Sequence, residues 1–287
     1  MMAGEEKNFW RRFKYDRLAM ASLGVILLFF FIALFGDWMA PYPYDLQETS
    51  ATLLPPGRGH WMGTDALGRD LFSRLIYGTR VSMAVSLLTA LSALVLGTFY
   101  GALSGYLGGK IDNVMMRAVD VLYALPDLLL IILITVVIGR GMVGIFLALS
   151  LVGWITVARL IRGEVLRLKE LAYVEGARAT GATHRRILFR HILPNTLGVL
   201  IVTLTFRIPA AILAESTLSF IGLGLTPPAA SWGTLANEGW KGLKFYPHLI
   251  LFPSLAIFIT MLAFNFLGDG LRDALDPGRT TGRSAKG

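Results

Sequence analysis

Long uncharged runs of apolar residues alternate with short polar segments along this chain. Two further apolar stretches carry charges, with Asp120 and Asp127 in one and Arg207 and Glu215 in the other. Because a helix needs about 20 apolar residues to cross the core of a bilayer, the pattern predicts an all-α protein with six transmembrane helices. The expected spans cover residues 18–36, 81–109, 118–139, 141–158, 196–222 and 245–268.

The composition supports a membrane protein and narrows its chemistry. Of the 287 residues, 54% are hydrophobic and 16% are charged, whereas soluble proteins average about 45–50% apolar and about 25% charged residues. The chain has no cysteine, so disulfides and thiolate metal sites are excluded, and its four histidines show no paired ligand spacing. No HExxH or GxSxG motif is present, so we expect neither a metal site nor a catalytic residue in this chain.

The distribution of Lys and Arg predicts the orientation in the membrane. With the N-terminus inside, cytoplasmic segments contain nineteen of the 27 basic residues and outside segments contain seven, which fits the positive-inside rule. Both termini are therefore expected in the cytoplasm, and the net charge of +8 is read as topogenic, with no nucleic-acid binding. The expected parts are a cytoplasmic N-terminus (1–17), a transmembrane domain (18–268) with outside loops at 37–80 and 223–244 and a cytoplasmic loop at 159–195, and a cytoplasmic tail (269–287).

The first span has two interpretations. A cleaved signal peptide has an apolar core of about 7–15 residues. The uncharged run at 18–36 is longer than that, so we expect it to remain as an anchor.

Glycines recur at every fourth position of the second span. Such a stripe lets two helix backbones approach closely, and two interpretations stay open: packing inside one subunit, or a helix that slides against a neighbour. The same span ends in SGYLGGKI (104–111), which lacks the first Gly and the final Ser or Thr of a Walker A loop. Nucleotide binding is not expected here, so any ATP would be used by a partner. The glycines are Gly97, Gly101, Gly105 and Gly109.

The cytoplasmic loop has a regular pattern, and residues 175–195 read EGARATGATHRRILFRHILPN. Leu171, Val174 and Arg178 share one face of a short helix. Gly181 is expected to end that helix in the left-handed conformation.

A second short basic helix is expected after this glycine. Thr183 can cap it, and Pro194 is expected to mark the turn into the fifth span. Two helices broken at one glycine would form a rigid lever. The alternative is an ordinary positively charged connector.

This loop resembles the cytoplasmic EAA loop of ABC importer permeases, whose pattern is E-A-A-x3-G-x9-I-x-L-P. The departures, Gly176 at the first alanine and His191 at the isoleucine, look like the peptide-importer branch. Segments 60–83, 215–239 and 264–277 also resemble that branch, so the resemblance covers nearly the whole chain. It points to the dipeptide and oligopeptide permeases of the C-subunit type. The matching residues are Glu175, Ala177, Gly181, Leu193 and Pro194.

The resemblance implies a type I ABC importer permease fold in a bacterial or archaeal cytoplasmic membrane, surrounded by lipid. It also implies a homologous second permease, two ABC ATPase subunits that hold ATP and Mg, and an external substrate-binding protein. No cofactor is expected in this chain itself. At the ATPase contact the resemblance places Glu175, Gly176, Ala177, Arg178, Gly181 and Ala182.

Three rival functions stay open. The same branch contains nickel and glutathione importers, so cargo is undecided between these and peptides. An intramembrane enzyme is disfavoured because Asp120 and Asp127 lie on one expected helix. A stand-alone channel would conduct without any partner.

The charged residues inside the spans also have two interpretations. Arg207 and Glu215 are eight residues apart and cannot pair unless the fifth span breaks at Pro209. One interpretation pairs Arg207 with Asp120 or Asp127 of the third span. In the other, these four charged residues line a polar path for peptides.

The outside loop before the second span is rich in turn-forming residues, which Asx turns alone would explain. By resemblance, we expect this loop and residues 223–246 to receive the binding protein. The expected docking residues are Gly63, Thr64, Asp65, Gly68, Arg69, Asp70 and Trp232.

Overall fold

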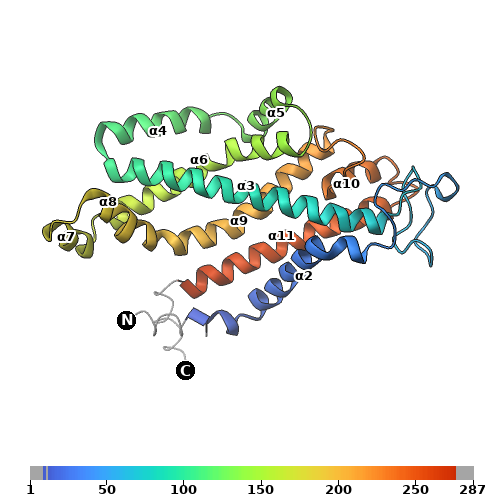
Figure 1. Ribbon diagram of the computed structural model, residues 1–287, viewed down its shortest axis with the longest axis horizontal. Coiled ribbons are helices and arrows are strands. Elements are labelled where there is room, and N and C mark those ends of the chain that lie inside the picture. The colour runs from blue at the N-terminus through green and yellow to red at the C-terminus, as the bar shows by residue number, and fades with distance from the viewer. Residues whose placement is uncertain (1–8, 11, 276–287) are drawn as a thin grey trace.

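The computed structural model describes residues 9–10 and 12–275 as an elongated bundle of helices (Figure 1). No strand forms in this described part, which contains one isolated β-bridge between Thr64 and Asp70. The expected all-α class is confirmed. Residues 1–8 and 276–287 of the expected cytoplasmic ends lie outside the described residues.

The long helices carry the apolar runs, and shorter helices lie between them in the sequence. The long ones are α2 (Arg17–Met39), α3 (Leu71–Leu107), α6 (Met142–Leu168), α9 (Leu193–Phe220) and α11 (His248–Leu275). The shorter ones are α4 (Gly109–Tyr123), α5 (Asp127–Ile138), α7 (Ala172–Ala179), α8 (His184–Arg186) and α10 (Trp232–Trp240), with a 3₁₀ turn at Thr49–Ala51 and a π-helical turn at Ile187–Ile192.

The expected third span is not one straight helix. Residues 118–139 instead belong to α4 and α5, whose axes differ by 85° across a short break before Pro126. Proline has no N–H and disfavours helical backbone in the preceding residue, so the break follows from the sequence Ala-Leu-Pro. Within the described residues five helices are long and apolar enough to cross a membrane, and six when the bent pair counts as one span.

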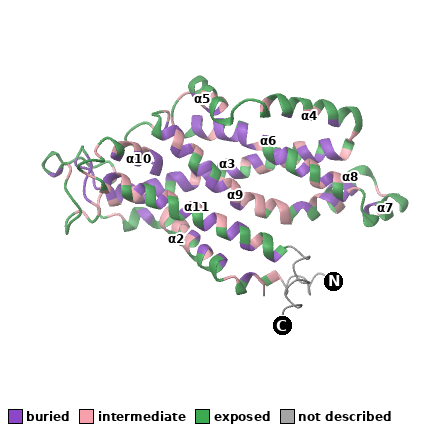
Figure 2. Cartoon of the chain, turned by 180° about the vertical axis from the view of Figure 1, so that it is seen from behind, coloured by how far each residue is buried: buried purple, intermediate pink, exposed green. Residues whose placement is uncertain are grey.

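The glycine stripe of α3 packs against α6 inside the chain. A Cβ added at Gly97 would clash with the side chain of Val157, and one added at Gly101 would overlap the carbonyl oxygen of Ala158. Only glycine allows the two backbones to come this close. The intrasubunit interpretation is therefore confirmed for Gly97, Gly101 and Gly105, whereas an added Cβ at Gly109, in the next helix, would meet nothing within 4 Å. Helices α3 and α6 form the centre of the bundle (Figures 1 and 2).

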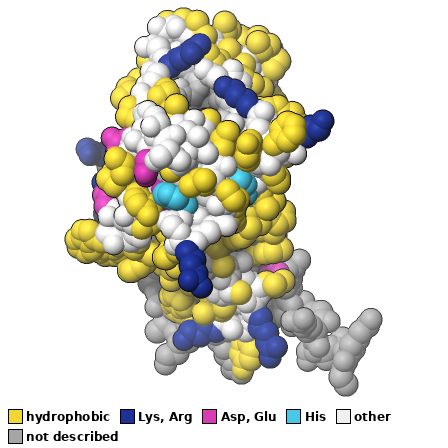
Figure 3. Space-filling model, turned by 90° about the vertical axis from the view of Figure 1, so that its right-hand side faces the viewer, with side chains coloured by type: hydrophobic (Ala, Val, Ile, Leu, Met, Phe, Trp, Pro, Cys, Tyr) yellow, Lys and Arg dark blue, Asp and Glu magenta, His cyan; other side chains and the backbone are white. Residues whose placement is uncertain are grey.

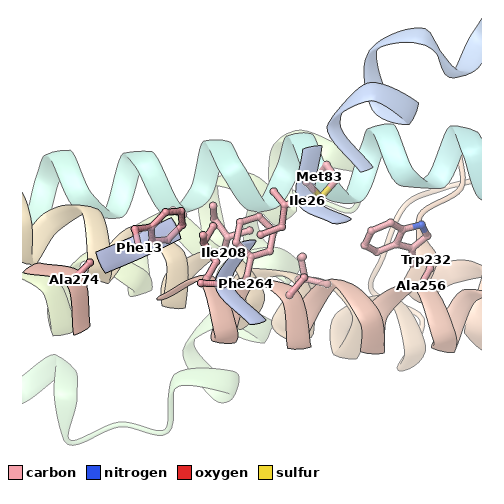
Figure 4. Packing of buried hydrophobic residues seen from close by; sticks show 13 residues of the cluster. Phe13, Ile26, Met83, Ile208, Trp232, Ala256, Phe264 and Ala274 are labelled. Atoms are coloured by element: carbon pink, nitrogen blue, oxygen red, sulfur yellow. The ribbon is translucent and has the colours of Figure 1, made fainter. Parts of the chain in front are cut away.

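A second layer of α2, α9, α10 and α11 packs on this pair. Its core includes Ile26, Ile208, Trp232 and Phe264, which come from different helices. In Figure 4 Ile208 and Phe264 lie together, and Trp232 lies apart from them beside Ala256. Many apolar side chains on the outer faces are exposed, for example Leu34 of α2 at 73%. Exposed apolar bands of this kind mark contact with lipid or another subunit.

The two ends of the bundle are formed by different segments of the chain. The start of α2, the end of α11 and the helices α7 and α8 lie at one end, whereas α10 and the loop over residues 40–70 lie at the other (Figure 1). Seen from the loop end, the surface is mostly hydrophobic, with separate Lys and Arg side chains (Figure 3).

Candidate functional site

The segment between α6 and α9 folds as a helix followed by a tight stop. Helix α7 ends in a Schellman motif: the N–H of Gly181 donates to the carbonyl of Arg178 and that of Ala182 to the carbonyl of Ala177, both at 3.0 Å. Gly181 has φ +80°, the left-handed conformation expected for it. Thr183 then caps α8 by accepting from the N–H of Arg186 at 3.3 Å.

One side of α7 is anchored in the bundle. Val174 is fully buried, and it packs in a cluster with Val165 and Leu168 of α6 and with Ile187 after α8. The partly buried Ala177 and Ala182 pack against the same cluster. Leu171, which was expected on the same face as Val174, is 38% exposed. Helix α7 is therefore packed against the end of α6 and the segment that leads into α9.

The other side of α7 is free to meet a partner. Glu175, Gly176 and Arg178 are exposed, so this side presents one acid and one base around a glycine. Tyr173 donates its hydroxyl to the carbonyl of His191 at 3.2 Å. Burial raises the pKa of this hydroxyl, so it keeps its proton and this tie between α7 and the base of α9 persists at neutral pH.

The expected turn at Pro194 is wrong. Residues His184–Phe220 form one helical run of 37 residues, and Pro194 lies in the first turn of α9. The π-helical turn before it shifts the hydrogen bonds, so that the N–H of Leu193 reaches the carbonyl of Leu188. Proline has no N–H, so Pro194 donates no backbone bond to the preceding turn, yet the run stays helical and the second short helix is continuous with the fifth span.

Arg207 does not form an ion pair with an aspartate in the described structure. Its guanidinium donates to the carbonyl of Gly153 in α6 at 2.8 Å, and an added Cβ at Gly153 would lie 2.6 Å from that guanidinium. Helix α9 also runs unbroken past Pro209, so Arg207 and Glu215 do not meet. Glu215 is 1% exposed and accepts a hydrogen bond from Ser219 at 2.8 Å.

The two aspartates of the third span have different surroundings. Asp120 pairs with Arg159 of α6, and that guanidinium also lies 4.2 Å from the centre of the Tyr123 ring. Asp127 is exposed at the start of α5, just after the break. Asp120 therefore has its partner on α6, whereas Asp127 lies exposed at the bend and interacts electrostatically with Arg207 without an ion pair.

At the opposite end, the turn-forming residues are bound into a charged network. The Asp65 carboxylate accepts from the backbone N–H groups of Leu67 and Arg69 at 2.8 and 3.0 Å, and from Arg69 Nε and Arg74 Nη1 at 2.6 Å each. Both arginines also reach Glu238 of α10. This network joins the outside loop to α3 and α10.

All seven expected docking residues are buried. Asp70 caps α3 through Ser73 N at 2.8 Å and pairs with His60 Nδ1 at 2.9 Å. Trp232 is fully buried and donates its indole N–H to Thr79 at 3.2 Å. The exposed side chains nearby include Leu67, at 47%. Thr64, Asp65, Arg69 and Asp70 are buried, and Gly63 and Gly68 have positive φ.

Two sequence models of known families match this chain. The model described as the binding-protein-dependent transport system inner membrane component matches residues 93–281. The model described as the N-terminal transmembrane domain of oligopeptide transport permease C matches residues 7–56. The chain belongs to the binding-protein-dependent transport permeases.

Individual permeases of this kind are similar over nearly the whole chain. The dipeptide transport system permease of Bacillus subtilis strain 168 is 47% identical over 94% of this chain and 85% of its own length. The oligopeptide transport system permease of the same organism is 44% identical, covering 94% and 89%. The glutathione transport system permease of Pectobacterium atrosepticum is 43% identical, covering 94% and 90%.

A solved structure supports the fold. A chain in the inward-facing MetNI methionine ABC transporter aligns with a TM-score of 0.59 at 18% identity, covering 70% of this chain and 96% of that one. The chain is therefore a multi-pass inner-membrane permease subunit of an ABC importer. No group of three or more metal-binding side chains gathers within the described part of this permease.

The sequence analysis missed two sets of paired charges in this permease. The first joins Asp112 of α4 to Arg162 of α6, and the second joins Arg74 to Glu238. A signal for the first set was present, because Arg159 and Arg162 are three residues apart and so share a face of α6. The sequence did not show which helix that face meets.

Proposed function

We propose that this permease imports dipeptides and oligopeptides together with a homologous second permease, two ABC ATPase subunits and an external binding protein. The supporting observation is the 47% identity to a dipeptide permease over 94% of the chain. ATP and Mg belong to the ATPase subunits in this proposal, and the chain itself performs no covalent chemistry.

The exposed side of α7 is the proposed ATPase contact. Glu175, Gly176 and Arg178 would lie against the ATPase, while Val174 and Ala177 hold α7 to the bundle. Because Gly181 and its Schellman motif set the angle between α7 and α8, a push on α7 would move the bases of α6 and α9 as one unit. A remote site is coupled to a pathway when its ligand makes different contacts in the two conformational states of the protein.

The proposed peptide path runs past Asp120, Asp127 and Arg207. A peptide has a positive and a negative end, and these residues offer both signs of charge along the membrane-spanning segments. Glu215 belongs to the path only if the helices around it separate, because it is enclosed beside Ser219.

The loop over residues 40–70 is the proposed docking surface for the binding protein. A photoreactive residue at the exposed Leu67 should capture the loaded binding protein. The same residue at Trp232 should react only within the chain, because this side chain is fully buried. Capture of lipid or of the second permease alone from Leu67 would contradict the docking role.

Reconstitution tests the proposed function directly. The chain should co-purify with the second permease and the ATPases, and proteoliposomes of this complex should hydrolyse ATP faster when loaded binding protein and peptide are added. Radiolabelled dipeptide and oligopeptide should accumulate inside. A complex that transports no peptide under these conditions would overturn the assignment.

Glutathione is the second candidate cargo, because a glutathione permease is 43% identical to this chain. The same proteoliposomes should be offered glutathione and Ni²⁺ with each candidate binding protein. Uptake of either without uptake of dipeptides would move the assignment to that cargo and leave the architecture unchanged.

A further inference from the structure

Helix α4 is attached to the rest of the described structure in an unusual way. Of its 15 residues, only Asp112 and Val119 are buried, and none belongs to the four hydrophobic clusters. Its exposed side chains include Val114 at 71% and Val121 at 68%. Val119 is the one apolar side chain that this helix buries, so its polar contacts gain importance.

Two ion pairs to α6 provide such contacts. Arg162 grips the Asp112 carboxylate with Nε and Nη2, both at 2.6 Å, while Ser104 of α3 donates to the same carboxylate. Two turns further along α4, Asp120 pairs with Arg159. We name these four charged residues, Asp112, Asp120, Arg159 and Arg162, the Asp–Arg ladder.

The two rungs of the ladder differ in strength. The Asp112 side chain is 7% exposed and bound by a two-pronged guanidinium, the geometry of the stronger charge-assisted pairs. The Arg159 and Asp120 side chains are 41% and 48% exposed, and a single guanidinium nitrogen bonds one carboxylate oxygen, so this rung has fewer bonds. Between the rungs, α4 is also tied to α3, because the Tyr100 hydroxyl of α3 donates to the Met115 carbonyl at 2.8 Å.

Helix α4 also has a pivot at each end. Gly108 and Gly109 have φ +67° and +57°, and an added Cβ at Gly109 would meet no atom within 4 Å. Glycine is therefore favoured at position 109 by the positive φ. Close packing does not require a glycine there. At the other end, the 85° break separates α4 from α5. Segments between two such pivots can rotate by changing a few backbone angles.

The ladder connects this pivoted helix to the proposed ATPase contact. Arg162 lies on α6 six residues before its end at Leu168, and α7 begins at Ala172. Lys169 also donates to the carbonyl of Gly105 in α3 at 3.2 Å. A displacement of α7 thus reaches the ladder through the last turns of α6.

We propose that α4 is a hinged helix whose position is set by the Asp–Arg ladder, so that the ladder couples movement of α7 to opening and closing of the path beside α4. The inference rests on the proposed function, since the drive comes from the ATPases. The exposed Asp120–Arg159 ion pair opens first. The Asp112–Arg162 ion pair, near the glycines at the start of α4, holds the helix at that end.

Distance measurement tests this proposal. The chain has no cysteine, so spin labels can be attached at Arg117→Cys on α4 and Gly163→Cys on α6, both exposed. The complete importer is measured in lipid nanodiscs, without nucleotide and with trapped ATP. In the wild-type ladder the label-to-label distance should shift when ATP is trapped.

Variants of the Asp–Arg ladder test whether its ion pairs open during transport, as a latch would, or stay closed in every state. Asp112→Asn combined with Asp120→Asn should populate the shifted distance without nucleotide, and Arg159→Gln alone, at the exposed rung, should do so to a smaller extent. Glu164→Gln is the matched control, because it breaks an exposed ion pair within α6, to Arg167 at 2.5 Å, and should leave the distribution unchanged.

The outcomes distinguish this inference from the proposed function. If wild-type distances are the same with and without ATP in a complex that imports peptide, or if Arg159→Gln and the double variant keep the wild-type distribution, the ladder is not a latch. If the wild-type complex imports no peptide, the proposed function fails. The comparison of variants without nucleotide then still tests the ladder.

Discussion

At the residue scale, single backbone angles and buried charges determine the shape of both ends of the molecule. Gly181 illustrates the first, because its φ of +80° turns the chain between α7 and α8. No atom lies within 4 Å of an added Cβ there. Its constraint is therefore torsional and not steric.

Gly181→Val should change the angle between α7 and the base of α9. A β-branched residue in the left-handed region costs about 1–2 kcal/mol or more. We expect a normally inserted subunit whose peptide uptake falls and whose partner ATPase no longer responds to peptide. Gly163→Ala, at an exposed glycine of α6 with free space around it, should transport normally.

This prediction is measured by uptake and ATP hydrolysis in the same proteoliposomes. Wild-type transport by Gly181→Val would mean that the segment between α6 and α9 is a simple connector. Glu175→Lys, which reverses a charge on the exposed side of α7, should reproduce the loss of coupling without a torsional cost.

Asp65→Ala should strongly destabilise the outer end of the bundle. The change leaves Arg69 and Arg74, which are 4% and 1% exposed, to share Glu238, so one buried positive charge is uncompensated, and breaking a buried pair costs about 3–5 kcal/mol. The control is Asp37→Asn, whose pair with Arg80 is 57% and 66% exposed and should change stability by less than about 0.5 kcal/mol. Denaturant unfolding of the two purified variants provides the comparison, and similar losses would contradict the buried network.

At the element scale, the seam between α3 and α6 organises the bundle. Gly97, Gly101 and Gly105 each face backbone or branched side chains of α6, and such neighbours cannot move aside. The bent helix pair α4–α5 is different. Pro126 accounts for its bend, and polar contacts attach α4 to the bundle. The closely packed pair α3–α6 and the sparsely packed helix α4 are thus neighbours in one subunit.

Gly101→Leu should separate α3 from α6. Its side chain would enter the space occupied by the Ala158 carbonyl, and overpacking of this kind costs about 1–3 kcal/mol or more. We expect a lower midpoint of thermal unfolding in detergent. Gly24→Leu in α2, where nothing lies within 4 Å of an added Cβ, should unfold near the wild-type temperature, and equal midpoints would contradict the seam.

At the scale of the whole molecule, the bundle has two chemically different ends. Helix α7 lies at the end where α2 begins and α11 ends, and the loop over residues 40–70 lies at the other (Figure 1). The partition of Lys and Arg predicts that the α7 end faces the cytoplasm.

Labelling from outside tests this orientation. Gly59→Cys and Thr183→Cys are both exposed positions in a chain without cysteine. In sealed cells an impermeant maleimide should react at position 59 and not at position 183, and opening the membrane should make both react. External labelling at position 183 in intact cells would reverse the orientation.

The sequence by itself determined the helical class, the apolar spans and the stop at Gly181. These depend on neighbours within one or two turns: the length of an apolar run, a capping Thr183, and a glycine where φ must be positive. Helix α7 and its Schellman motif were predictable for this reason. The bend before Pro126 had a local signal too, but the apolar run around it favoured one straight helix.

Only the tertiary structure decided which charges meet and which helix ends are continuous. Arg207 binds the Gly153 carbonyl, 54 positions away, and Arg162 binds Asp112 from 50 positions away. Pro194 lies inside a continuous helix because the π-helical turn and its contacts to α7 support it. The physical reason is that local backbone preferences are set by adjacent residues, whereas the partner of a buried charge depends on how helices distant in sequence pack.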